Sequence, residues 1–118
     1  MNQIAFVFRT SPHGRTRGRE GLDALLATSA FSEELAVFFV EDGLYQLLAG
    51  QVPTQVLSRD HAPSFKLLPL YDIEQIYFCQ DSLTARGLTA DGLLIPGQAL
   101  DAAALADTLA QYPVRLIF

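Results

Sequence analysis

The sequence predicts an α/β protein built on a mainly parallel sheet of about five strands, with helices on both faces. Short apolar runs recur along the chain without polar alternation, which is typical of strands buried on both faces of a parallel sheet. Segments with helical periodicity or helix-start signals separate these runs, and such alternation indicates parallel strand–helix–strand connections. With 118 residues, the chain has the length of one domain, which we expect to span residues 1–118.

The first half of the chain is expected to alternate between strands and helices. Residues 3–8 and 34–40 are the two apolar runs that predict strands. Between them a helix is predicted from about Thr16 to Ser29, with a buried stripe at helical spacing formed by Leu22, Leu25, Leu26 and Ser29. A short helical segment is expected at residues 44–48, a loop at 54–62 and a helical turn or two at 64–68.

The second half is expected to contain three more strands. Residues 76–78 form an apolar run with β-branched and aromatic members, which favours a buried strand. Asp81 or Ser82 is expected to cap a short helix after it, and Gly87 to end that helix. A strand is predicted at residues 92–96, a helix from its cap Asp101 to residue 111, and a last strand at residues 114–118.

The composition indicates a protein that needs partners. Half of the residues are hydrophobic and only 18% are charged, whereas roughly 25% are charged in an average soluble domain. A chain of this length cannot bury that much apolar surface within itself, so the surplus indicates a partner surface or an oligomer interface. The net charge of −5 disfavours direct nucleic-acid binding, which depends on cationic side chains.

Few residues could hold a metal, a disulfide or a membrane anchor. The single cysteine excludes an internal disulfide and a cysteine-based zinc cluster, and the two histidines, His13 and His61, match no metal-ligand spacing. No secretory signal is visible, and no apolar run approaches the ~20 residues of a membrane helix. We therefore expect a cytoplasmic protein that contacts no membrane and holds no metal or cofactor.

The candidate catalytic residue is Cys79, because it lies where a buried strand meets a helix. In parallel sheets active sites lie at this carboxyl end of the strands, and the positive end of the following helix favours a thiolate. The negative charge of Asp81 is expected to oppose that effect. The alternative interpretation is a buried cysteine that serves as a small apolar residue. The acidic pairs at 33–34 and 41–42 are expected to be solvated strand ends.

A basic loop follows the first strand and contains four of the eight basic residues, Arg9, Arg15, Arg17 and Arg19. Its glycine spacing fits neither the dinucleotide-binding nor the P-loop pattern. One interpretation is an anion site at a helix N-terminus, and another is a solvated loop whose arginines pair with acidic residues of a neighbour. A third is a partner-binding surface, in which Arg15, Arg17 and Arg19 attract an acidic carrier protein.

Several segments together resemble the sulfur-relay proteins of the DsrE/DsrF/DsrH family, at matching spacing over nearly the whole chain. The most specific of them is the run Gly18-Arg19-Glu20-Gly21-Leu22-Asp23-Ala24. The others lie at residues 4–8, 11–14, 25–30, 42–48, 65–68 and 70–75.

The resemblance implies a three-layer α/β sandwich and a subunit of a heterohexameric sulfurtransferase complex. It implies TusB-like and TusD-like sister subunits, with two copies of each subunit. In such a complex, persulfide sulfur passes from a TusA-like carrier toward a TusE-like carrier, for 2-thiolation of the tRNA wobble uridine. The resemblance places the working cysteine in the TusD-like sister, so this chain is expected to be a non-catalytic structural subunit.

Two alternatives remain beside that expectation. One is a persulfide-carrying sulfurtransferase that uses Cys79, although Gln80, Asp81 and Ser82 follow it where the sister subunit has small apolar residues. The other is a DsrF-like subunit in dissimilatory sulfur oxidation.

Overall fold

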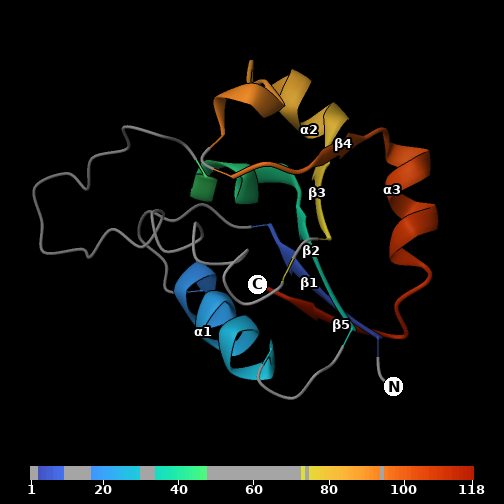
Figure 1. The fold of residues 1–118 in the computed structure, drawn as a ribbon. Helices are drawn as coiled ribbons and strands as arrows, with labels where there is room; N and C mark the ends of the chain where they lie inside the picture. The colour runs from blue at the N-terminus through green and yellow to red at the C-terminus, as the bar shows by residue number, and fades with distance from the viewer. Residues whose placement is uncertain (1–2, 10–16, 30–33, 48–72, 74, 94) are drawn as a thin grey trace, which may run out of the picture.

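Five strands form one sheet, and every neighbouring pair in it is parallel (Figure 1). The order across the sheet is β4-β3-β2-β1-β5. In chain order the strands are β1 Gln3–Phe8, β2 Glu34–Phe39, β3 Ile76–Cys79, β4 Gln98–Leu100 and β5 Val114–Ile117. The computed structural model describes residues 3–9, 17–29, 34–47, 73, 75–93 and 95–118.

Helices cover the two faces of the sheet and its carboxyl end. α1 (Arg17–Ser29) lies between β1 and β2 in the chain, and α3 (Ala102–Leu109) between β4 and β5. The two helices lie on opposite faces of the sheet, while α2 (Gln80–Ala85) lies beyond the end of β3 (Figure 1). Two short 3₁₀ segments, η1 (Glu41–Leu47) and η3 (Ala90–Gly92), complete the described elements. The predicted α/β fold with a five-stranded parallel sheet and two outer layers is confirmed.

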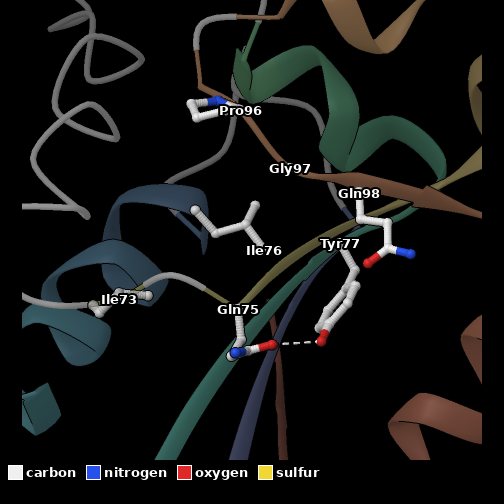
Figure 2. Close-up of a pocket in the computed structure, with 7 residues that line it drawn as sticks. All are labelled: Ile73, Gln75, Ile76, Tyr77, Pro96, Gly97 and Gln98. Carbon is white, nitrogen blue, oxygen red and sulfur yellow. Dashed lines mark hydrogen bonds between the residues drawn. The ribbon is translucent and has the colours of Figure 1, made fainter.

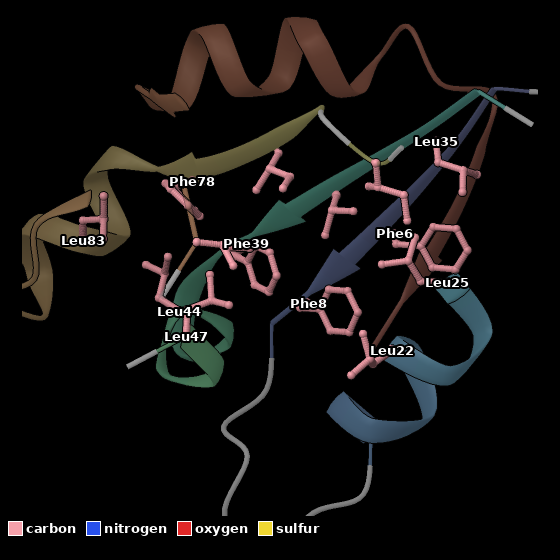
Figure 3. Close-up of a cluster of buried hydrophobic side chains, with 14 residues drawn as sticks. Phe6, Phe8, Leu22, Leu25, Leu35, Phe39, Leu44, Leu47, Phe78 and Leu83 are labelled. Atoms are coloured by element: carbon pink, nitrogen blue, oxygen red, sulfur yellow. The ribbon is translucent and has the colours of Figure 1, made fainter. Parts of the chain in front are cut away.

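The larger part of the core lies on the α1 face of the sheet. Phe6 and Phe8 of β1 point toward Leu22 and Leu25 of α1 (Figure 3). The Phe8 and Phe39 rings stack with their centroids 5.2 Å apart, which joins β1 to β2 through side chains as well as through the ladder. Burying each such side chain stabilises the fold by about 1.5–3 kcal/mol.

The α3 face has a thinner cover. Its buried residues are Ala5, Val7, Ala36 and Phe38, and the residues that pack over them from α3 and the turn after it are only partly buried, namely Leu105, Leu109 and Tyr112. The Tyr112 ring meets Phe38 edge-on, with centroids 6.0 Å apart. Burial raises the pKa of the Tyr112 phenol, and the nearby Tyr77 and Glu34 add to the shift.

The predicted strand at residues 92–96 is wrong, because β4 begins at Gln98, two residues after that range ends. Ile95 in this apolar run is buried in the α1-face core instead of joining the ladder. Pro96 then lacks an N–H for strand pairing. At Gly97 a Cβ would lie 2.7 Å from the Phe78 ring and 2.9 Å from the Ile76 carbonyl oxygen. Only a glycine lets the backbone come this close to β3, so pairing starts at the next residue.

Three smaller expectations are also corrected. The N-cap residue of α2 is Cys79 rather than Asp81 or Ser82. The helical segment expected at residues 44–48 is a 3₁₀ helix that begins at Glu41. In the stripe of α1, Leu22 and Leu25 are buried, whereas Leu26 and Ser29 are only half-buried.

The segments expected at residues 54–62 and 64–68 lie outside the described residues. Gly87 follows α2 with φ +66°, the left-handed conformation expected of a glycine that ends a helix.

Replacing Gly97 with alanine should destabilise the fold by about 1–3 kcal/mol, because the added methyl group overlaps the Phe78 ring and the Ile76 carbonyl. Chemical denaturation of the purified variant measures this loss. Gly92→Ala is the matched control, since the nearest side-chain atom to its Cβ, the Thr89 hydroxyl oxygen, is 3.5 Å away. The control should stay within about 0.5 kcal/mol of the parent chain. Equal midpoints for both variants would contradict the close approach at Gly97.

Candidate functional site

Cys79 is the last residue of β3 and the residue that precedes α2. Its backbone is extended, with φ −77° and ψ 114°, and the helix starts at Gln80 without a turn between them. The thiol makes no capping hydrogen bond to α2, and Cys79 is only 8% exposed. The residue therefore occupies the strand-to-helix corner that the sequence predicts, but in a buried position.

The start of a second helix lies beside Cys79. In the β3–β4 ladder Cys79 is paired in register with Leu100, and α3 begins directly afterwards. Asp101 is the N-cap residue of α3, and its Oδ1 accepts a 2.8 Å hydrogen bond from the Ala104 backbone N–H. Helix N-termini favour negative charge, and at α3 the Asp101 carboxylate already supplies it.

A buried serine fixes α2 to the loop after β2. Ser82 lies in the first turn of α2, and its Oγ accepts a 2.9 Å hydrogen bond from the Glu41 backbone N–H. Glu41 has φ +50°, a conformation that costs a non-glycine residue of order 1–3 kcal/mol. Two residues on, a Cβ at Gly43 would overlap the Phe8 carbonyl group. The strained turn is therefore held from both sides, by Ser82 and by the end of β1.

Two ion pairs join the start of η1 to the residues that follow β1 and α2. Arg9 Nη2, after β1, lies 3.0 Å from Glu41 Oε2. Arg86 Nη2, after α2, lies 2.9 Å from Asp42 Oδ1, and its Nη1 donates to the Ser82 carbonyl at 3.2 Å. Exposed pairs of this kind contribute about 0–1 kcal/mol each, so they fix loop positions more than they stabilise the fold.

The sequence does not predict these arginine partners. The acidic pair at 41–42 is expected to be solvated, and both carboxylates are exposed, yet each contacts an arginine. The available signal was positional, since Arg9 and Glu41 follow β1 and β2 and the carboxyl ends of parallel strands share one edge. That signal identifies a pair only once the two strands are known to be neighbours.

Among the described side chains, the arginines at this end of the sheet, Arg9 and Arg86, pair with Glu41 and Asp42. A reactive cysteine needs access and a cationic or basic neighbour. Asp81, in the first turn of α2, is exposed and acidic, and the two histidines lie outside the described residues. Within the described ranges no group of three metal-ligating side chains occurs. The geometry suits a cysteine that packs as a small apolar residue.

The basic loop is only partly described. Arg15 lies outside the described residues, while Arg17 and Arg19 fall at the start of α1, where the structure describes their backbone alone. Arg9 is the member of the loop whose side chain is placed, and it is paired with Glu41. The expectation that Arg15, Arg17 and Arg19 bind an acidic carrier therefore stays a prediction.

A cavity of about 430 Å³ lies at the opposite end of β3 from Cys79. Figure 2 shows its lining residues, which come from the first residues of β3 and β4 and from the segments just before them: Ile73, Gln75, Ile76, Tyr77, Pro96, Gly97 and Gln98. The Tyr77 hydroxyl donates a 2.6 Å hydrogen bond to Gln75 Oε1. These lining residues carry no charge, so the cavity suits an uncharged group.

Comparison with known proteins places the chain in a family. The family model described as the DsrE/DsrF-like family matches residues 2–116. The chain belongs to the DsrE/DsrF-like family.

Two curated relatives are similar over most or all of their length. The chain is 56% identical over 119 residues to "Protein TusC" of Escherichia fergusonii, with 100% of both chains covered. It is 53% identical over 109 residues to "Protein TusC homolog" of Vibrio vulnificus, with 92% of both covered.

Solved structures show the same fold at low sequence identity. The crystal structure of the YchN protein from E. coli matches with a TM-score of 0.81 at 19% identity, and 100% of both chains is covered. A protein of unknown function from Methanobacterium thermoautotrophicum matches with a TM-score of 0.71 at 12% identity, again over 100% of both chains. In the part of the chain that the structure describes, no helix is long and apolar enough to cross a membrane.

The buried thiol of this family member should react slowly with thiol reagents. A group that is 8% exposed reacts mainly through local opening, so we expect labelling of the native chain by a disulfide reagent to be about tenfold or more slower than in denaturant. The control is Ala106→Cys in a Cys79→Ser background, because Ala106 is exposed on α3 and its thiol should label rapidly. Native Cys79 that labels as fast as this control would contradict the buried position.

Proposed function

We propose that this chain is a non-catalytic structural subunit of a TusBCD-type sulfurtransferase complex, which relays persulfide sulfur for 2-thiolation of the tRNA wobble uridine. The observation that carries the proposal is the full-length similarity to relatives named TusC, at 56% identity with both chains covered completely. The chain acts there as one DsrE/DsrF-like domain spanning residues 1–118, in the cytoplasm. The same similarity favours this pathway over a DsrF-like role in dissimilatory sulfur oxidation.

The partners of the chain are proteins. TusB-like and TusD-like sister subunits join it, with two copies of each subunit, and TusA-like and TusE-like carriers deliver and receive the sulfur. The apolar surplus of the sequence supports such an assembly, because half of the residues are hydrophobic in a chain of 118. The net charge of −5 supports a role without direct contact to nucleic acid.

The surroundings of Cys79 support a structural role. The thiol is buried, belongs to the last residue of β3 and precedes a helix with Asp81 in its first turn. Sulfur relay requires a carrier thiol that can meet the thiols of two other proteins in turn, since persulfide passes by attack of one sulfur on another. A sister subunit with an accessible cysteine meets that requirement better.

Assembly should be visible when the chain is co-expressed with the TusB-like and TusD-like proteins of the same genome. Purification through a tag on this chain, followed by native mass spectrometry, should give one complex that contains two copies of each subunit. The apolar surplus predicts that the chain alone is less soluble than the complex. A well-behaved monomer that binds neither sister would contradict the proposal.

The second candidate function is persulfide transfer by Cys79 itself. The observation that favours it is the pairing of Cys79 with Leu100, which places the Cys79 backbone beside the starts of both α2 and α3. Two helix N-termini favour an anion more than one does. The burial of Cys79 and the Asp101 carboxylate at the second helix start count against it.

The substitution Cys79→Ser should leave sulfur relay by the reconstituted complex largely unchanged. The working thiol is assigned to the TusD-like sister, so this chain loses only a small buried side chain. The new hydroxyl, if it finds no partner, costs about 1–3 kcal/mol of stability. Melting temperature and complex mass must therefore be measured together with the transfer of labelled sulfur. Loss of transfer with unchanged assembly and melting temperature would make Cys79 a relay site.

A further inference from the structure

In the part of the chain that the structure describes, the last strand, β5, leaves an apolar edge uncovered. Among the described strands it pairs with β1 alone, at one end of the sheet, and all four of its residues are exposed. Val114 is 40% exposed, Leu116 39% and Ile117 54%. Among the described residues these are the exposed large hydrophobic side chains. An exposed edge strand of this kind presents backbone N–H and C=O groups that can pair with another strand.

The exposed side chains of β5 point to both faces of the sheet. Val114 and Leu116 are in register with Ile4 and Phe6, which contribute to the α1-face core, while Ile117 is in register with Val7 on the α3 face. A helix or loop placed on one face would cover only one of these sets. A strand added along the edge covers both, and it also pairs the outward backbone groups of β5.

The single charge on this edge restricts the partner. Arg115 is exposed, and its Nε donates a 3.1 Å hydrogen bond to the Tyr112 carbonyl, which fixes the guanidinium beside the strand. Among the residues with described side chains, no carboxylate forms an ion pair with it. A partner strand with apolar residues and a carboxylate opposite Arg115 would complement the edge in shape and in charge.

A second copy of this chain fits the edge poorly. Two β5 strands related by a twofold axis pair antiparallel, with side chains of the same face opposite each other. If the axis passes at Arg115, the two arginines lie directly opposite. If it passes at Leu116, each arginine lies opposite Ile117, and the two arginines are diagonal neighbours about 7–8 Å apart. Like charges meet in both registers, so a different chain is the better partner.

We propose that the β5 edge (Val114, Arg115, Leu116 and Ile117) is the surface through which this chain binds a strand of a sister subunit, and that this strand carries a carboxylate opposite Arg115. The inference deepens the proposed function and rests on it, because the sister subunits are the partners considered. It adds that the two sheets are continuous across the interface and that the partner differs in sequence from this chain.

The test uses the chain co-expressed with its TusB-like and TusD-like sisters, with two variants on β5. Ile117→Lys places a charge on the apolar edge, and Arg115→Glu reverses the charge that selects the partner. Each should weaken assembly about tenfold or more, while the melting temperature of the chain alone changes little, because both side chains are exposed. Ala106→Lys, on the exposed side of α3, is the control and should assemble normally. In the wild-type complex, hydrogen exchange at residues 114–117 should slow relative to the chain alone.

The outcomes separate this inference from the proposed function. If the complex forms but exchange at residues 114–117 is unchanged and both variants assemble like the control, the β5 interface is wrong and the subunit role stands. If the wild-type chain alone is a dimer that Ile117→Lys dissociates, a second copy occupies the edge and the inference is overturned. If the wild-type chain binds neither sister, the proposed function fails and the inference fails with it.

Discussion

The structure depends on the burial of β1 and β2 on both sides. Residues 5–8 and 35–39 are buried at every position, so these strands need a covering layer on each face. α1 supplies the cover on the side of Phe6 and Phe8, and α3 supplies a thinner cover on the side of Ala5 and Val7. Parallel strands buried on two faces require helical crossovers, and the three-layer arrangement follows from that requirement.

The sequence was sufficient for these central strands because their apolar runs are continuous. It failed where local pattern and tertiary contact disagree. The run at residues 93–95 resembles a strand, but Ile95 fills the core, and the strand begins only after Gly97 allows the chain to approach Phe78. The order of the strands was likewise not readable from the sequence. For that reason the pairing of Arg9 with Glu41 across neighbouring strand ends could not be predicted.

The two sites differ in what the sequence could say about them. The corner position of Cys79 follows from a strand run and a helix start, and both are local signals. Its burial depends on β4 and on the start of α3, which lie some twenty residues further along the chain. The β5 edge was visible only as an unassigned apolar surplus in the composition, since the exposure of Val114, Leu116 and Ile117 depends on β5 being the outer strand.

The central claim is that this chain holds a sulfur-relay complex together while another subunit carries the sulfur. The most direct test is whole-protein mass spectrometry of the reconstituted complex. The complex is supplied with a persulfide-loaded TusA-like carrier, and the reaction is stopped during turnover before the masses are measured. The account predicts one added sulfur atom on the TusD-like subunit and an unmodified mass for this chain. An added sulfur on this chain, removed by a thiol reductant and absent in the Cys79→Ser variant, would contradict the account.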